Sequence, residues 1–281
     1  MPHHSRRALP ETQDLLRLTV LATRRLSEHW MRVTLGGGDI ARFTPMGFDQ
    51  WFRLFLPVHG GDGLERVPAK ANKMLGYLKL LRIPEEQRPV MRSYTVRAFR
   101  ELGESGGAEI DVDFVIHRAP DGGLGPAPAW ALAAEPGEDV ALIDEGTGFN
   151  PRRPPERVLL VGDETALPAI AGICASLPGG TRGSALVEIP AREDAQDLAR
   201  PEGLEVRWIV RNDPHEVPGR AAAEALASTE LPEGDGPFYA FIAGEQQLPT
   251  GARRHLVAER GVDKDDIGFC GYWRVGRDRR G

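Results

Sequence analysis

The segment RVLLVGDETALPAI, residues 157–170, decides the fold class of this chain. It opens with a nearly continuous apolar run, which is typical of a strand buried on both faces of a parallel sheet. The stretch LPAIAGICASL, residues 167–177, follows at once and has the composition of a helix. Thr165 is placed to cap that helix, and proline is tolerated in a first helical turn, where Pro168 stands. We therefore expect a buried strand that leads directly into a helix.

The same alternation continues toward the C-terminus. Strand candidates lie at residues 184–190, 205–211, 239–244 and 267–273, and helix candidates lie at residues 219–228 and 249–261. Strands that alternate with helices predict a parallel sheet. Upstream, the segment FNPRRPPERV, residues 149–158, contains three prolines and has the character of a linker.

The first half of the chain is rich in short strand candidates instead. They occupy residues 17–26, 30–37, 50–57, 92–99, 109–117 and 138–144, separated by Gly, Pro and Asp. The clearest alternates Ile110, Val112 and Phe114 with Asp111 and Asp113. A helix candidate, MLGYLKLL at residues 74–81, interrupts the series. We predict an N-terminal antiparallel β-barrel in residues 16–150 and a parallel-sheet α/β domain in residues 151–281.

The composition excludes several classes of protein. The 281 residues carry a formal net charge of -6, and the sequence pI is about 5.7, which disfavours bulk attraction to nucleic acid. No apolar run approaches the ~20 residues of a membrane span, and the N-terminus has no signal-peptide pattern. The only cysteines, Cys174 and Cys270, provide neither a disulfide framework nor metal-ligand spacing. We expect a cytoplasmic protein without membrane insertion and without a metal site.

Residues 92–95, RSYT, combine a cation, an aromatic ring and a hydroxyl on one predicted strand. Alternation places Arg92 and Tyr94 on one face and Thr95 on the other. A guanidinium binds phosphate, a tyrosine ring stacks on a flat heterocycle, and a short hydroxyl bonds the edge of that heterocycle. A flavin dinucleotide needs all three groups. The alternative is an ordinary strand with an exposed arginine and a half-buried tyrosine.

A second candidate is the glycine-rich loop after residue 117. Gly122, Gly123 and Gly125 precede a helix candidate that opens with Pro126. Such a loop at a helix start presents backbone N–H groups to an anion, so the pattern suits a pyrophosphate. His117 ends the preceding strand, and alone it is more often a structural histidine than a functional one.

The α/β half lacks the dinucleotide fingerprint G-x-G-x-x-G. Asp163 and Glu164 occupy the place of a phosphate-binding loop, where carboxylates would repel a pyrophosphate, so the alternative is a plain helix start. Glu188 ends the second strand, where an acid accepts a hydrogen bond from a ribose hydroxyl in NAD sites, and Arg192 nearby suits a 2′-phosphate. For both, the alternative is a solvated turn. The segment AGE, residues 243–245, is either a ligand contact or a strand-to-helix turn.

Taken together, the motifs MRSYTVR, DFVIH…GPAPAWA, GDETALPAI, AGE and GYWRVGR resemble the siderophore-interacting protein family. They occur in the family's order and span about residues 16–277. The resemblance implies an FAD-binding barrel followed by an NAD(P)-binding α/β domain, as in ferredoxin reductases. Two positions depart from the family pattern: Pro128 stands where Ser or Thr is usual, and Arg53 stands where lysine is common.

The resemblance also implies roles for individual residues. In the first domain, with Thr95 near flavin N5, the FAD ligands would be Arg92, Ser93, Tyr94, Thr95, Val96, Arg97, His117, Gly125, Pro126, Ala127 and Trp130. In the second domain, the dinucleotide ligands would be Asp163, Glu164, Thr165, Ala166, Gly244 and Glu245. Members of the family are thought to hold anionic ferric siderophores with basic residues, and the candidates here are Arg53, Arg254 and Arg274.

The implied activity is that of a ferric-siderophore reductase. NADPH or NADH would reduce FAD, and FAD would reduce the Fe(III) of the siderophore, which releases iron as Fe(II) in the cytoplasm. No catalytic acid or base is required, because the cofactor carries the redox chemistry. We expect a monomer, with a ferredoxin as an alternative electron donor. The sequence leaves two other functions open: an oxidoreductase for another acceptor, and a siderophore-binding flavoprotein that is not an enzyme.

Overall fold

The structure, a computed structural model, describes residues 7–57, 63–118, 122–211, 213 and 216–276. In that part, the chain forms two compact units. We call residues 9–46 and 50–146 the N-terminal domain, and we call residues 7–8, 47–49 and 147–276 the C-terminal domain. Among the described helices, none has the length and apolar character needed to cross a lipid bilayer.

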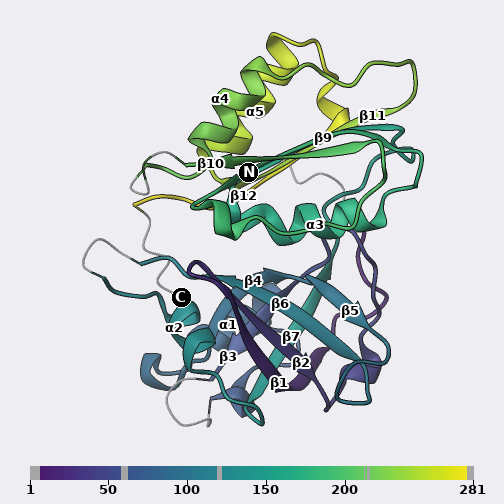
Figure 1. The fold of residues 1–281 in the computed structure, drawn as a ribbon. Coiled ribbons are helices and arrows are strands. Elements are labelled where there is room, and N and C mark those ends of the chain that lie inside the picture. Colours follow the sequence, from purple (N-terminus) through teal and green to yellow (C-terminus); the bar gives the residue numbers. More distant parts are fainter. Residues whose placement is uncertain (1–6, 58–62, 119–121, 212, 214–215, 277–281) are drawn as a thin grey trace. The chain divides into compact units, whose positions relative to one another are not determined.

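The N-terminal domain is built on a seven-stranded antiparallel sheet in the order β4-β3-β7-β1-β2-β6-β5 (Figure 1). Its strands are β1 (Leu15–Ser27), β2 (Trp30–Gly36), β3 (Trp51–Leu56), β4 (Val90–Thr95), β5 (Ala98–Arg100), β6 (Glu109–Val115) and β7 (Asp139–Gly146). The backbone between β4 and β5 bonds to strands on both sides. The Val96 N–H donates to Gln50 O over 2.8 Å, and the Arg97 N–H donates to Asp111 O over 2.9 Å. The sheet therefore curls into the predicted barrel-like form.

Two helices cover this sheet. α2 (Pro126–Ala133) packs Ala127 and Ala131 into the main core, beside Val112 and Phe114 of β6. α1 (Met74–Leu81) rests on a second apolar cluster that includes Phe55 of β3. Both the predicted alternation of β6 and the predicted helix at 74–81 are confirmed.

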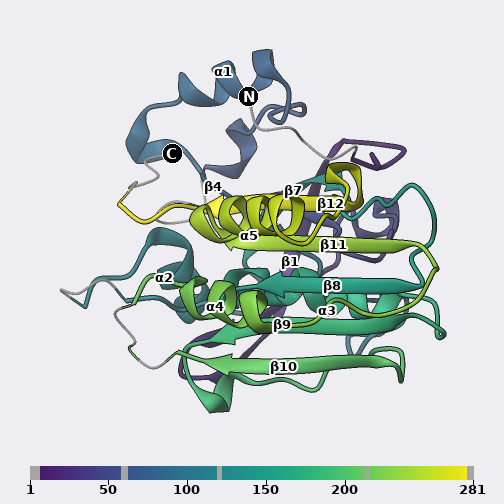
Figure 2. The same ribbon diagram turned by 90° about the horizontal axis from the view of Figure 1, so that it is seen from above.

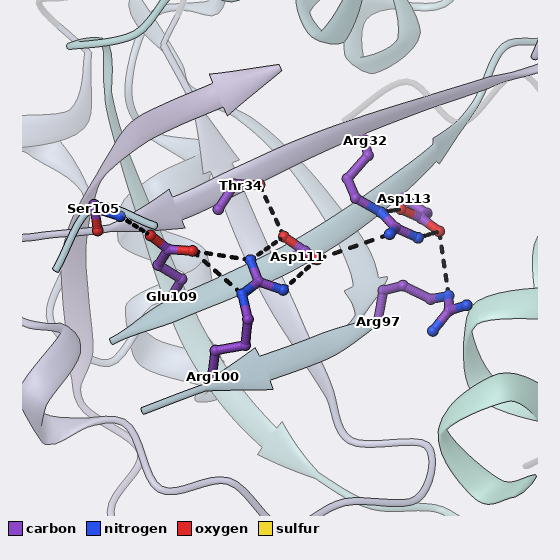
Figure 3. Close-up of polar contacts among 8 residues, drawn as sticks. All are labelled: Arg32, Thr34, Arg97, Arg100, Ser105, Glu109, Asp111 and Asp113. Carbon is purple, nitrogen blue, oxygen red and sulfur yellow. Dashed lines mark hydrogen bonds and ion pairs between the residues drawn. The ribbon is translucent and has the colours of Figure 1, made fainter. Parts of the chain in front are cut away.

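The carboxylates of β6 lie on the opposite face from its apolar side chains. Arginines from neighbouring strands bond to them: Arg32 Nε lies 2.6 Å from Asp113, and Arg100 Nη1 lies 2.6 Å from Asp111 (Figure 3). Thr34 Oγ1 also donates to Asp111 over 2.8 Å. Because every charge has an opposite charge close by, this face of the barrel tolerates buried carboxylates.

The C-terminal domain contains a five-stranded parallel sheet in the order β10-β9-β8-β11-β12. Its strands are β8 (Arg157–Gly162), β9 (Arg182–Ile189), β10 (Leu204–Val210), β11 (Phe238–Glu245) and β12 (Ile267–Trp273), and its α-helices are α3 (Leu167–Ser176), α4 (Arg220–Ser228) and α5 (Gln247–Ala258). α3 covers one face of the sheet and α4 and α5 cover the other (Figures 1 and 2). The parallel sheet predicted from residues 157–170 is confirmed.

Short 3₁₀ helices complete the described elements: η1 (Ile40–Arg42), η2 (Leu64–Arg66), η3 (Glu85–Gln87), η4 (Glu164–Ala166), η5 (Arg192–Asp194) and η6 (Lys264–Asp266). η4 corrects one expectation. Thr165 does not cap α3, whose N-cap is Ala166; instead Asp163 caps η4 by accepting the Thr165 N–H over 2.9 Å. Because the 3₁₀ turn η4 lies between β8 and α3, the capping side chain is Asp163, two residues before the predicted Thr165.

The strand order identifies where a ligand would bind in this domain. β8 lies in the middle of the sheet, with β9 and β10 on one side and β11 and β12 on the other. The connections therefore change direction between β8 and β11. In open α/β sheets, ligands bind beyond the C-terminal ends of the strands at such a switch point. The segment GDET begins at the last residue of β8, and AGE forms the C-terminal end of β11.

Candidate functional site

β4 carries the RSYT motif at the edge of the N-terminal sheet, paired with β3. Arg92 and Tyr94 are half-buried and alternate with exposed Ser93 and buried Thr95. The Arg92 Nη1 donates to the Met91 carbonyl over 2.8 Å. Burial raises the pKa of the Tyr94 hydroxyl, so the ring stays neutral. The strand therefore offers a cation and a neutral aromatic ring on one face and a hydroxyl on the other.

An aromatic chain joins β4 to the helix that follows the glycine-rich loop. The centroids of the Tyr94 and Phe114 rings are 4.3 Å apart, and those of Phe114 and Trp130 are 5.6 Å apart. Trp130 belongs to α2, and its indole N–H donates to Glu138 Oε2 over 3.2 Å. The RSYT motif and the helix after the glycine-rich loop, about 30 residues apart in sequence, thus lie together in one domain.

The start of α2 has fewer N–H donors than a usual helix start. Gly125 is its N-cap, without a side-chain capping bond, while Pro126 and Pro128 carry no N–H. The Ala129 N–H is already bonded to the Gly125 carbonyl over 3.0 Å. The Ala127 N–H is the remaining donor of that first turn. A β-bridge between Arg118 and Leu124 holds the ends of the loop together, beside half-buried His117.

These residues fit FAD by the chemistry of their donors. The bound cofactor would need a charged donor for its phosphates, a flat surface for its ring system and a polar edge contact. Arg92 and Tyr94 supply the first two groups from one face of β4, and the Ala127 N–H adds one phosphate donor. Thr95 carries the hydroxyl, but its side chain is buried on the other face of the strand. At Gly122, a Cβ would meet nothing within 4 Å, so the loop has open space beside it. Since the helix start is poor in donors, most of the phosphate contact would fall to Arg92.

Two arginines that we expected to meet anions have carboxylate partners in the protein. Arg53 Nε lies 2.7 Å from Glu145 Oε1, and the Glu145 side chain is almost fully buried. Arg97 Nε lies 3.4 Å from Asp113 Oδ2, and burial lowers the Arg97 pKa (Figure 3). The Glu145 carboxylate thus offsets part of the positive charge that Arg53 would present to a ligand.

The remaining basic candidates, Arg254 and Arg274, belong to the C-terminal domain, where both are exposed. Arg254 lies on α5 and Arg274 directly follows β12.

The GDET and AGE segments meet at the C-terminal edge of the parallel sheet. The Asp163 Oδ2 accepts the Glu245 N–H over 2.6 Å, and its Oδ1 accepts the Thr165 Oγ1–H over 2.5 Å. Gly244 has φ +137, and a Cβ there would lie 2.5 Å from Asp163 Oδ2. Glycine is thus needed at 244 so that this carboxylate can approach the backbone. The two segments form one bonded unit.

Glu245 fixes the chain on the other side of this edge. One of its carboxylate oxygens accepts the Gln247 N–H at the start of α5 over 2.7 Å, and the other accepts the Val275 N–H over 3.2 Å. Asp163, Glu164, Ala166 and Glu245 are fully buried. Their side chains therefore shape the edge, and any contact with a dinucleotide would fall to Thr165 and to the backbone.

The structure does not support a ribose contact by the Glu188 side chain, which was one of two interpretations of the sequence. It is fully buried, and its carboxylate accepts the Gly219 and Ala222 N–H groups over 3.0 and 2.9 Å at the start of α4. Arg211 Nε also donates to it over 2.8 Å. The solvated-turn alternative is equally wrong, since Glu188 caps a helix from a neighbouring strand. Arg192, in contrast, is exposed in η5.

Arg211 is the residue of this edge that sequence reasoning missed. Its Nη2 lies 2.5 Å from Glu164 Oε2 while its Nε bonds Glu188, and its side chain is only 3% exposed. It follows β10 directly and thereby links the ends of three neighbouring strands. The only signal in the sequence was an arginine directly after the apolar run at residues 208–210.

The buried Asp163 carboxylate predicts a dependence of stability on pH. Burial raises the pKa of Asp163 from 3.8 to about 7, and the nearby Glu164 charge acts in the same direction. Between about pH 4 and pH 7 the folded state therefore holds a proton that the unfolded state has lost, so stability falls as the pH rises. Asp163→Asn cannot titrate. We expect the unfolding free energy of the wild type, relative to that variant, to fall by up to about 1.4 kcal/mol per pH unit.

Urea unfolding of both proteins across this pH range measures the difference. Parallel curves for the wild type and Asp163→Asn would show that Asp163 is already ionised in the folded protein.

Comparison with known proteins places these sites in a family. The siderophore-interacting FAD-binding domain model matches residues 19–148, and the siderophore-interacting protein model matches residues 155–276. Ferric vibriobactin reductase ViuB of Vibrio cholerae is 29% identical over 278 residues, covering 99% of this chain and 94% of that protein. The NADPH-dependent ferric-chelate reductase of Escherichia coli is 27% identical over 261 residues, covering 92% of each.

A solved structure agrees with these sequence matches. The siderophore-interacting protein SipS from Aeromonas hydrophila is 30% identical, with a TM-score of 0.69, and the match covers 93% of this chain and 99% of SipS. Both halves of the chain are thus matched by the same family in sequence and in fold. The chain belongs to the siderophore-interacting protein family.

Proposed function

We propose that this protein is an FAD-dependent ferric-siderophore reductase that takes its electrons from NADPH. The observation that supports the proposal is the contact of β4 and α2 through the Tyr94–Phe114–Trp130 rings, which brings the RSYT motif near the helix that follows the glycine-rich loop. The named activities of the Vibrio and Escherichia relatives support the reaction and the electron donor.

The residues of the N-terminal domain bind and orient the cofactor. Arg92 and the Ala127 N–H hold the phosphates, Tyr94 contacts the ring system, and Thr95 contacts its edge near N5. Ser93, Val96, Arg97, His117, Gly125 and Pro126 complete the proposed set. Bound FAD supplies the chemistry, because it accepts two electrons from a nicotinamide and passes single electrons to iron.

In the C-terminal domain, we propose that NADPH binds at the switch point between β8 and β11. Thr165 and the backbone at Gly244 provide the contacts, while the buried carboxylates of Asp163 and Glu245 hold the edge in shape. Exposed Arg192 is the candidate for the 2′-phosphate that distinguishes NADPH from NADH. Steady-state reduction with each nucleotide tests this assignment, since Arg192→Ala should raise KM for NADPH and leave KM for NADH unchanged.

We also propose an assignment of the domains, the localisation, the oligomeric state and the electron donor. We assign residues 16–150 to FAD and residues 151–281 to NADPH, and we expect a cytoplasmic monomer. A ferredoxin is the alternative electron donor. Anaerobic reduction by NADPH, compared with reduction by a reduced ferredoxin, identifies the donor, and sedimentation at several protein concentrations identifies the oligomeric state.

The substrate is an anionic ferric chelate that meets Arg53. Because Glu145 neutralises part of the Arg53 charge, two substitutions should act in opposite directions. Arg53→Ala should raise KM for an anionic ferric siderophore by roughly three- to tenfold, and Glu145→Gln should lower it, since one partly screened charge is worth about 1 kcal/mol. Flavin content should stay unchanged in both. Loss of FAD from Arg53→Ala would show that Arg53 belongs to the cofactor site instead.

A further inference from the structure

α1 exposes a row of large apolar side chains. Met74 and Leu75 are 74% and 75% exposed, and Leu78 and Leu81 are 46% and 38% exposed. These positions recur at helical spacing and cover one face of the helix. The opposite face, with Gly76 and Leu80, is buried against the barrel. The helix therefore has apolar side chains on both faces, and the barrel covers only one of these faces.

The segment that contains this exposed face is rich in basic residues. Residues 66–84 contain Arg66, Lys70, Lys73, Lys79 and Arg82 and no acidic residue, and the exposed Glu65, Glu85 and Glu86 directly flank them. Three of the chain's four lysines lie in this short segment, although the whole chain has a net charge of -6. All five basic side chains are exposed. The local charge is thus opposite in sign to that of the protein as a whole.

We infer that α1 and its basic border, residues 66–84, dock on the surface of a lipid bilayer that contains anionic phospholipid. A helix with leucines on one face and lysines or arginines beside them lies in the plane of the headgroups, with its apolar side chains among the upper acyl groups. Anionic lipid attracts the lysines, and the leucines and Met74 leave water. The inference goes beyond the proposed reductase activity and does not depend on bound FAD.

A second copy of this chain is a poorer occupant of the same face. A symmetric dimer through α1 would bring two identical patches together, so five positive charges would face five positive charges. Like charges across an interface are destabilising, and the five basic residues outnumber the flanking Glu65, Glu85 and Glu86. A bilayer with anionic headgroups has the complementary charge and also accepts the apolar row.

Co-sedimentation of the full-length protein with lipid vesicles tests the inference. We expect the wild type to bind vesicles of phosphatidylcholine mixed with phosphatidylglycerol, and to bind pure phosphatidylcholine vesicles much more weakly. Binding should weaken as salt is added, because screening shortens the reach of the lysine charges. Leu75→Ser with Leu78→Ser should reduce binding by at least about tenfold, since two leucines no longer leave water.

Two further variants complete the experiment. Replacing Lys70, Lys73 and Lys79 by Gln should remove the preference for phosphatidylglycerol. Leu102→Ser is the matched control, because Leu102 is 76% exposed in the same domain but lies outside the patch, and it should bind as the wild type does. All of these side chains are exposed, so circular dichroism should show every variant folded. Equal binding to both vesicle types, wild-type binding by the double leucine variant, or dimerisation through α1 without vesicle binding would overturn the inference.

Discussion

Replacing Arg211 by Met is expected to lower the free energy of unfolding by about 3–5 kcal/mol. Arg211 bonds Glu164 and Glu188, both of which are fully buried. Removing the guanidinium leaves two carboxylates without their cation in a place that water does not reach. The bonds that are lost lie at the edge where β8, β9 and β10 end. The substitution should therefore disturb the proposed dinucleotide site as well as lower the stability.

Urea unfolding measures this effect, with Arg207→Met as the matched control. Arg207 lies on the same strand but is exposed, so its replacement should change the free energy by no more than about 0.5 kcal/mol. Combining Arg211→Met with Glu164→Met should restore part of the loss, because one stranded charge is then removed. A decrease of less than about 1 kcal/mol for Arg211→Met alone would mean that the carboxylates find other compensation.

The second large effect concerns Arg92→Ala, which should weaken FAD binding by about 10- to 100-fold. A hydrogen bond to a charged group contributes about 1.5–3 kcal/mol, and Arg92 is the main phosphate donor we assign. Other groups should not easily replace the lost Arg92 contact, since the prolines at 126 and 128 remove two N–H donors from the start of α2. The fold should be retained, because Arg92 is only half-buried on β4, an edge strand of the sheet.

Titration of the apoprotein with FAD, followed by flavin fluorescence, gives the dissociation constants. Arg42→Ala is the control: its side chain is half exposed in the same domain and pairs with Asp14, so FAD affinity should not change. Wild-type affinity in Arg92→Ala would assign the phosphate contact to other residues.

Patterns of local alternation predicted the fold well. The alternation of Ile110, Val112 and Phe114 with aspartates predicted β6, and the apolar run at 157–162 predicted a central strand of a parallel sheet. Both signals depend on neighbours along the chain, which a single sequence contains. The apolar spacing of residues 74–81 predicted α1 for the same reason, although not that one apolar face would remain exposed.

The site was harder to predict where partners come from distant strands. Glu188 stood at the strand end expected of a ribose ligand, but the start of α4, some 30 residues later, turns back onto it. Arg211 bonds Glu164 across 47 residues, and Arg53 meets Glu145 on another strand. No local pattern contains such pairings. They depend on strand order, which brings GDET beside AGE at the switch point between β8 and β11.

The central claim is that this protein passes electrons from NADPH through FAD to a ferric siderophore, and one anaerobic experiment tests it most directly. FAD-loaded protein is mixed with NADPH, and a ferric siderophore is then added together with a coloured Fe(II) chelator. We expect NADPH to bleach the flavin absorbance, and we expect the ferric siderophore to restore it while the Fe(II) complex appears. A flavin that NADPH bleaches but only a quinone reoxidises, with no Fe(II) formed, would contradict the account.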